Sequence, residues 1–119
     1  MLCKLSNGVI LANQVRYADT FAARFFGMML KRQFPHEYDA LLLTPCNSVH
    51  TFFMFYPLDL LFLDSEIKVL RIYENLAPCR SWATVRGAKH VLELAAGRVA
   101  RSGVKVGDML IFSERERRG

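Results

Sequence analysis

The segment from residue 46 to residue 64, CNSVHTFFMFYPLDLLFLD, contains the residue types that most often do chemistry in proteins. His50 and Asp59 form its most suggestive pair. If the chain turns at Tyr56 and Pro57, these two side chains share one face of a hairpin, with Cβ atoms about 7 Å apart. A nearby carboxylate stabilises the imidazole cation and raises its pKa, which places a base near neutrality. The alternative is that His50 is a hydrogen-bonded core histidine and that Asp59 binds backbone amides.

Cys46 is a second candidate, either as a nucleophile or as a metal ligand together with His50. Four residues of a straight strand span about 13 Å, which is too far for one zinc ion with ligand bonds near 2 Å. No neighbouring residue in the sequence clearly lowers the pKa of the thiol. We therefore predict no metal site and no cofactor. A hydrolase that uses His50 and Asp59, with Cys46 or water as the nucleophile, stays open as an alternative.

Two further residues point to binding. Trp82 lies in a segment with Arg80 and Arg86, where an indole could stack on a ligand or anchor a loop to the core. Glu93 stands in an apolar strand, so it is either on a solvated face or in need of a partner. The main prediction is a binding or accessory module with a shallow pocket for a small molecule or a partner segment. The expected lining is His50, Phe52, Met54, Asp59, Trp82 and Glu93.

The elements that would position these residues are mostly short strands. Asn7-Gly8 between apolar runs predicts a hairpin with a type I′ turn. Phenylalanines at helical spacing predict a short helix that ends near Gly27, and residues 95–103 predict one or two helical turns. The predicted strands cover residues 40–45, 48–53, 58–64, 67–73, 88–94 and 104–112, and neighbouring strands form an antiparallel meander. The expected class is mainly β (α+β), a compact antiparallel β-barrel or sandwich with one or two short helices.

Length and composition predict one domain. The chain has 119 residues, 52% of them hydrophobic, three cysteines without CxxC spacing and a net charge of +5. We expect a single β-rich domain over residues 1–112 and a basic flexible tail over residues 113–119. No apolar run reaches the roughly 18 residues of a spanning helix, so the expected location is the cytoplasm, with reduced thiols.

The late position of many cations keeps nucleic-acid binding as a second alternative, ranked behind a small molecule or a protein partner. The residues concerned are Arg98, Arg101, Lys105, Arg115, Arg117 and Arg118.

Several ordered motifs resemble those of the domain-of-unknown-function 192 family (uncharacterised protein family 0127), a family of small bacterial and archaeal proteins. The motifs are Gly27-Met28-Met29, Met54 followed by Pro57-Leu58-Asp59, Val91 to Gly97, and Gly107-Asp108. The resemblance implies a compact β-barrel-like fold and no established reaction. The family often carries Arg or Lys directly after the methionine of the second motif, where this chain has Phe55. If that cation helps to bind an anion, this chain has either lost the anion site or binds the anion with another residue.

Overall fold

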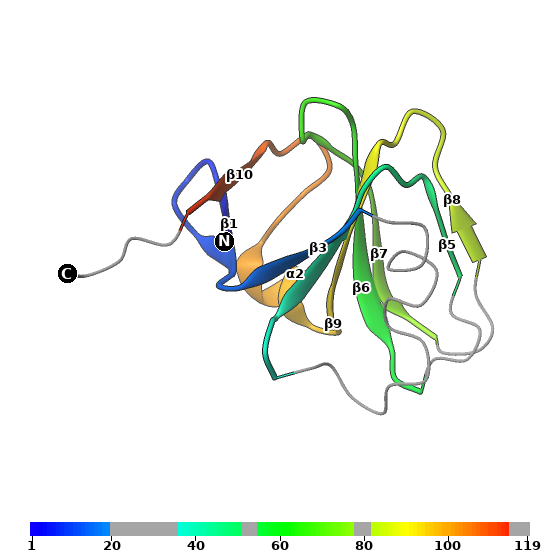
Figure 1. Ribbon diagram of the computed structural model, residues 1–119, viewed down its shortest axis with the longest axis horizontal. Coiled ribbons are helices and arrows are strands. Elements are labelled where there is room, and N and C mark those ends of the chain that lie inside the picture. Colours follow the sequence, from blue (N-terminus) through cyan, green and yellow to red (C-terminus); the bar gives the residue numbers. More distant parts are fainter. Residues whose placement is uncertain (20–35, 51–54, 78–81, 115–119) are drawn as a thin grey trace.

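The fold is mainly β and sandwich-like. The computed structural model describes residues 1–19, 36–50, 55–77 and 82–114, with only the backbone for His50 and Trp82 (Figure 1). The strands are β1 (Leu2–Leu5), β2 (Ile10–Ala12), β3 (Val15–Ala18), β4 (Ala40–Leu43), β5 (Ser48–His50), β6 (Leu58–Leu63), β7 (Val69–Leu76), β8 (Trp82–Thr84), β9 (His90–Ala95) and β10 (Leu110–Ser113). One short helix, α2 (Arg98–Ser102), lies within these ranges. The predicted mainly-β class is confirmed, and the described strands form no closed barrel.

The hairpin predicted at Asn7-Gly8 is present and connects β1 to β2. The backbone N–H of Leu5 donates to the carbonyl oxygen of Val9 at 2.8 Å, which closes a loop over residues 6–8. Gly8 has a positive φ of 92°, whereas Asn7 is not among the positive-φ residues. A type I′ turn needs positive φ at both central residues, so the predicted turn type is wrong. The extra residue lets the loop close with one left-handed residue, which glycine adopts without strain.

The five-stranded sheet holds the centre of the molecule, with strand order β3-β4-β9-β6-β7. The predicted meander is confirmed for β6 and β7, which are antiparallel neighbours. It is wrong elsewhere, because β9 returns from late in the sequence to lie between β4 and β6. β3 and β4 are parallel. Periodicity in the sequence reports which residues are buried but not which strands become neighbours, so the insertion of β9 had no local signal.

β5 does not form the predicted hairpin with β6. It pairs with β8 in a separate two-stranded sheet, in which His50 is the register partner of Trp82. β8 lies between residues 73 and 88, where the sequence analysis predicted no strand. The prediction of a shared His50–Asp59 hairpin face is therefore wrong. The predicted helix before Gly27 lies outside the described residues.

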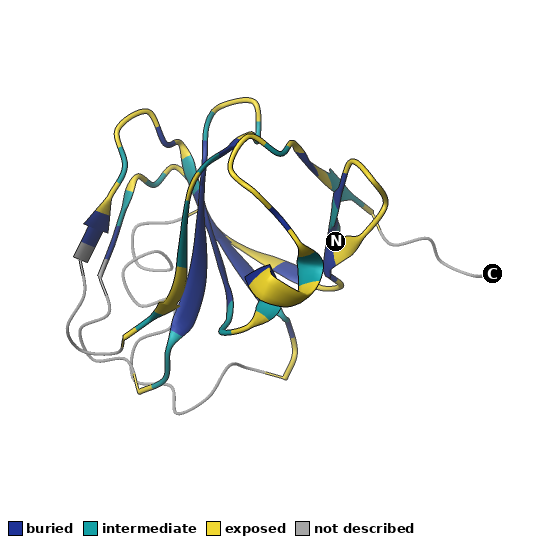
Figure 2. Ribbon diagram, turned by 180° about the vertical axis from the view of Figure 1, so that it is seen from behind, coloured by how far each residue is buried: buried dark blue, intermediate teal, exposed yellow. Residues whose placement is uncertain are grey.

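Two apolar layers cover the two faces of the five-stranded sheet. In Figure 1 the sheet of β1, β2 and β10 lies to one side of it, and β5 and β8 lie to the other. Leu61, Leu92 and Leu94 pack in the layer that includes Leu11 and Val99. Leu60 and Val91 pack in the layer that includes Val49 and Ala83. All six residues of β6 are buried, and Figure 2 shows the central strands in dark blue. A strand covered on both faces has a continuous apolar sequence instead of an alternating one.

Candidate functional site

Asp59 is a buried carboxylate that ties three elements together. It is 1% exposed and is the second residue of β6. Its Oδ1 accepts a hydrogen bond from the backbone N–H of Asn75 at 2.8 Å. Its Oδ2 accepts the backbone N–H groups of Gly97 at 3.1 Å and Val99 at 3.0 Å. Gly97 is the N-cap residue of α2 and has no side chain to cap the helix, so Asp59 supplies the acceptor for the first turn.

The hydrogen bond from the Asn75 N–H to Asp59 explains a shift in the register between β6 and β7. One residue, Asp59, separates Leu58 from Leu60, whereas two residues separate their register partners Leu76 and Tyr73. Asn75 lies in this bulge with a positive φ of 52°, a conformation that asparagine tolerates better than most residues. The carboxylate of Asp59 therefore stabilises both a bulge and a helix start. These three backbone contacts give it a structural role and do not support a carboxylate that orients His50.

The other predicted site residues are placed only in part. The backbones of His50 and Trp82 lie side by side as register partners. Phe52 and Met54 lie outside the described residues. Cys46 is half-buried, and its Sγ donates to the carbonyl oxygen of Ser48 at 3.1 Å. Ligand contact by His50 and Trp82 stays a prediction.

Glu93 is the second buried carboxyl, and its surroundings differ from those of Asp59. It is 3% exposed at the centre of β9, with Leu41 and Leu60 as its register partners on the two neighbouring strands. Its Oε2 is buried and has no hydrogen-bond partner among the described residues. Burial raises the pKa of Glu93 to about 8, because desolvation disfavours the charged form. At neutral pH the folded protein therefore holds this carboxyl mainly in its protonated form.

Two tyrosines lie close enough to Glu93 for its charge to affect them. Burial raises the pKa of Tyr56, and the charge of Glu93 raises it further. Burial also raises the pKa of Tyr38, where the positive charge of Arg16 opposes it and the charge of Glu93 adds to it. Tyr38 belongs to the apolar layer on the Glu93 side of the sheet. Glu93 is thus a protonatable group in an apolar layer that has tyrosine rings nearby.

Tyr38 also lines an open cleft at the edge of the five-stranded sheet, which we call the Tyr38 cleft. Its volume is about 370 Å³. The residues before β4, the residues before β3, the end of β9 and the start of α2 surround it, and its lining is Asn13, Gln14, His36, Glu37, Tyr38, Asp39, Ala95 and Arg98. Ala95 lies two residues after Glu93 and therefore on the same face of β9. Tyr38 packs in the apolar layer on the Glu93 side, whereas α2 contributes Val99 to the opposite layer, so the cleft lies where the two layers end.

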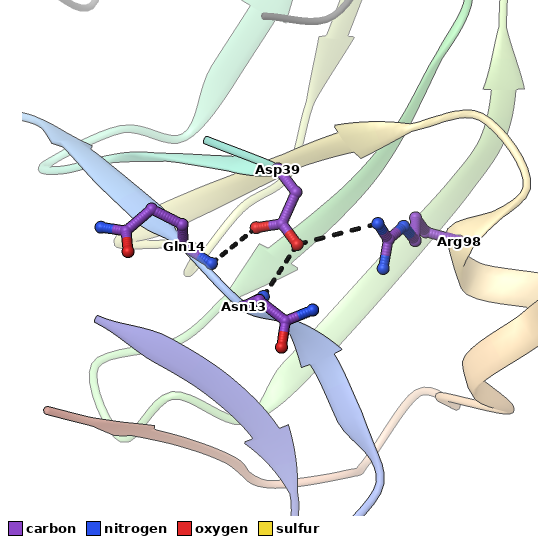
Figure 3. Close-up of polar contacts among 4 residues, drawn as sticks. All are labelled: Asn13, Gln14, Asp39 and Arg98. Atoms are coloured by element: carbon purple, nitrogen blue, oxygen red, sulfur yellow. Dashed lines mark hydrogen bonds and ion pairs between the residues drawn. The ribbon is translucent and has the colours of Figure 1, made fainter. Parts of the chain in front are cut away.

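Asp39 builds the polar wall of this cleft (Figure 3). Its two oxygens accept the backbone N–H groups of Asn13 and Gln14, each at 2.8 Å. One oxygen lies 3.7 Å from a guanidinium nitrogen of Arg98. The N–H of Asp39 donates to the carbonyl oxygen of Gln14 at 3.0 Å, which fixes the start of the parallel pair β3–β4. Asp39 is not among the candidates drawn from the sequence, although aspartate side chains often accept backbone N–H groups where the chain turns.

We expect Asp39→Ala to lower the free energy of unfolding by about 1–2 kcal/mol, because two backbone amides lose a charged acceptor. We expect Arg98→Ala to cost less than about 1 kcal/mol, since its ion pair with Asp39 is partly exposed. Urea unfolding of both variants checks the order. An equal loss in the two variants would mean that the ion pair, not the amide contacts, fixes the loop.

The described residues contain no group of three or more His, Cys, Asp or Glu side chains that could hold a metal ion. Nor does any helix in the ranges given above have the length and apolar character needed to cross a membrane.

Comparison with solved structures supports the fold. A candidate transcription regulator from Sinorhizobium meliloti superposes with a TM-score of 0.79 at 28% sequence identity, covering 92% of this chain and 89% of that chain. A protein of unknown function from Novosphingobium aromaticivorans superposes with a TM-score of 0.78 at 23% identity, covering 93% of this chain and 82% of that chain. The second likeness concerns the fold alone.

Comparison with protein families and curated relatives gives the family. A UPF0127 protein of Thermococcus sibiricus is 30% identical over 123 aligned positions, which span 99% of this chain and 78% of that protein. A UPF0127 protein of Pyrococcus furiosus is 31% identical over 114 positions, 92% of this chain and 95% of that protein. These two relatives come from archaea, so they do not confirm a bacterial source. The profile of the DUF192 family, described as "Uncharacterized ACR", matches residues 3–112, and the chain therefore belongs to the DUF192 family.

Proposed function

We propose that this chain is a binding module for a small polar molecule and that the ligand occupies the Tyr38 cleft. The observation that carries the proposal is a cleft of about 370 Å³, together with the buried carboxyl of Glu93, whose Oε2 has no partner among the described residues. That volume falls in the range of small-molecule sites. Tyr38 links the two features, because it lines the cleft and its pKa responds to Glu93.

The burial of Glu93 supports the proposal because it lowers the stability of the folded protein. Its Oε2 is unpartnered among the described residues, and an unmatched buried polar group costs about 1–3 kcal/mol. An apolar residue of similar volume would remove that cost. Buried acids with strongly raised pKa values concentrate at functional sites. We infer that the neutral carboxyl of Glu93 serves the ligand site, either by contact with the ligand or through Tyr38.

The lining of the cleft indicates the chemistry of the ligand. Both oxygens of Asp39 are engaged by backbone amides, so this carboxylate shapes the wall. Among the described residues, Arg98 has one ion pair, at 3.7 Å, and its other guanidinium donors can bind an anionic group. Glu37 and the side chains of Asn13 and Gln14 are exposed and offer acceptors and donors. A small molecule with one anionic group and several hydroxyl or amine groups matches this set.

An NMR screen with polar fragments tests the proposal. The fragments are amino acids, hydroxy acids and monosaccharides, and we expect the amide signals of Tyr38, Asp39 and Ala95 to shift with at least one of them. Gln14→Tyr fills the cleft while its backbone contact with Asp39 remains, so it should abolish these shifts. Glu74→Tyr, an exposed position on β7 away from the cleft, is the matched control. Absence of shifts at the cleft, or unchanged binding by Gln14→Tyr, would contradict the proposal.

The two alternatives from the sequence gain less support. A hydrolase with a His50–Asp59 pair requires a carboxylate that is free to orient the imidazole, whereas Asp59 is occupied by three backbone amides. A nucleic-acid site in the C-terminal region requires aromatic rings beside the cations for base stacking. The cleft beside Arg98 and Arg101 is lined instead by Val9, Ile10, Leu11 and Ser102. Arg115, Arg117 and Arg118 lie outside the described residues.

A further inference from the structure

A second cleft runs along the free edge of the three-stranded sheet. The strand order is β10-β1-β2, so β2 pairs with β1 on one side and with no described strand on the other. The cleft has a volume of about 270 Å³, and its lining is Val9, Ile10, Leu11, Arg98, Arg101 and Ser102. Successive side chains of a strand point to opposite faces. Three consecutive residues can therefore line one cleft when the cleft runs along the edge of the backbone.

The wall opposite β2 is cationic. Arg101 is exposed, and no described residue forms an ion pair or hydrogen bond with its side chain. Within the described residues, the one ion pair of Arg98 is the contact with Asp39 at 3.7 Å. Lys4 on β1 is the register partner of Ile10, so it lies on the Ile10 face of the sheet and not in this wall. Among the residues that line the cleft there is no carboxylate to balance these charges.

The side of the cleft formed by β2 and the residue before it is apolar, and Val9 and Ile10 are exposed there whereas Leu11 is buried. Val9 is 40% exposed and Ile10 is 49% exposed. Lys4 is the register partner of both Ile10 and Ile111, so the three residues form a row across the sheet. Ile111 is 42% exposed. A strand added beside β2 would continue this row on one face and would meet the arginines of α2 on the other.

We propose that β2 binds an extended acidic segment of a partner protein as a fourth strand of this sheet. The backbone of the segment hydrogen-bonds to the free edge of β2, which is the common mode of strand addition. Its alternate side chains divide between the two faces. Apolar side chains pack beside Ile10, and carboxylates pair with Arg98 and Arg101 in charge-assisted hydrogen bonds. The recognised pattern is thus apolar–acidic alternation. This site is separate from the Tyr38 cleft, although Arg98 lines both.

The probe is a fluorescein-labelled peptide of alternating valine and glutamate, measured by fluorescence anisotropy against the whole chain. We expect saturable binding, with shifts and slowed hydrogen exchange for the amides of residues 10–12 in NMR spectra. Arg101→Glu should weaken binding by about tenfold or more, since it replaces a charge-assisted pair with a repulsion. Arg86→Glu is the matched control, because Arg86 is exposed, lies outside this cleft and makes the same change in net charge. The control should bind like the unchanged protein.

Further probes separate strand addition from simple charge attraction. The same peptide with N-methyl groups on alternate residues cannot pair with a strand edge and should fail to bind. A valine–lysine peptide should also fail. Equal binding of the N-methylated peptide, equal effects of Arg101→Glu and Arg86→Glu, or no binding of the valine–glutamate peptide would overturn the proposal. Preferential binding of a short DNA duplex to this cleft, or a dimer of the chain that forms through β2, would overturn it too.

Discussion

Replacing Asp59 with alanine is expected to lower the free energy of unfolding by roughly 3–5 kcal/mol. Each buried donor that loses its partner costs about 1–3 kcal/mol, and this carboxylate serves the backbone N–H groups of Asn75, Gly97 and Val99. Small domains have only about 5–15 kcal/mol of stability in total. The substitution should therefore bring the protein close to unfolding at room temperature. Asp59→Asn keeps the shape of the side chain and one acceptor oxygen. Its free energy of unfolding should therefore lie between those of the natural chain and of Asp59→Ala.

Urea unfolding monitored by circular dichroism measures this loss. Asp64→Ala is the matched control, because Asp64 also accepts two backbone N–H groups, those of Glu66 and Lys68. These contacts are local to one turn at the surface, so water replaces them and the loss should be clearly smaller. Equal destabilisation of the two variants would show that Asp59 does not tie β6, the β7 bulge and α2 together.

The stability of the protein is expected to fall as the pH rises from about 4.5 to about 8. The folded state raises the pKa of Glu93 from 4.5 to about 8, so in this window the folded chain keeps a proton that the unfolded chain has lost. Because the folded state then binds more protons, raising the pH favours unfolding. The stability contributed by the neutral carboxyl is fully present below pH 4.5 and is lost through pH 8. The total loss from this group is roughly 5 kcal/mol.

Urea unfolding at several pH values between 4 and 9 tests this, on the natural chain and on Glu93→Gln. His90 acts in the opposite direction, because burial lowers its pKa from 6.5 and its stability contribution is lost as the pH falls. The difference between the two proteins cancels that effect and should retain the downward slope of Glu93. Glu93→Leu should be more stable than the natural chain at pH 8. A difference that is independent of pH would contradict a neutral buried Glu93.

Two of the motifs that carry the family resemblance are in direct contact in the structure. Pro57-Leu58-Asp59 and the segment from Val91 to Gly97 lie far apart in the sequence. They meet where the Oδ2 of Asp59 accepts the N–H of Gly97. Gly97 has a positive φ of 97°, which a residue with a side chain adopts only with strain. The aspartate and the glycine therefore act together to start helix α2. This structural role accounts for both motifs without requiring that either residue take part in catalysis.

Much of the architecture could be predicted from the sequence because its signals are local. The apolar runs at β4, β6 and β9 indicated buried strands. Gly103 marked the end of α2, and its φ is 75°. The strand predicted over residues 104–112 is shorter in the structure, because a turn with Gly107 at a φ of 96° precedes β10. Each signal depends on a residue's own burial or backbone preference. The predicted β5–β6 hairpin does not form because β5 pairs with β8, and β6 pairs with β7 and with β9 from late in the chain. No local pattern in the sequence encodes that choice of partners.

The sequence by itself determined that this chain folds as a mainly β domain of the DUF192 family, since composition, apolar periodicity, turn residues and ordered motifs are all properties of the chain. Only the tertiary structure decided what its two buried acids do. Asp59 meets three backbone amides, whereas the Oε2 of Glu93 meets no described partner. The two residues look alike in the sequence, each an acid in an apolar strand. Their difference arises from which strands, bulges and helix ends become neighbours, and long-range pairing alone sets that.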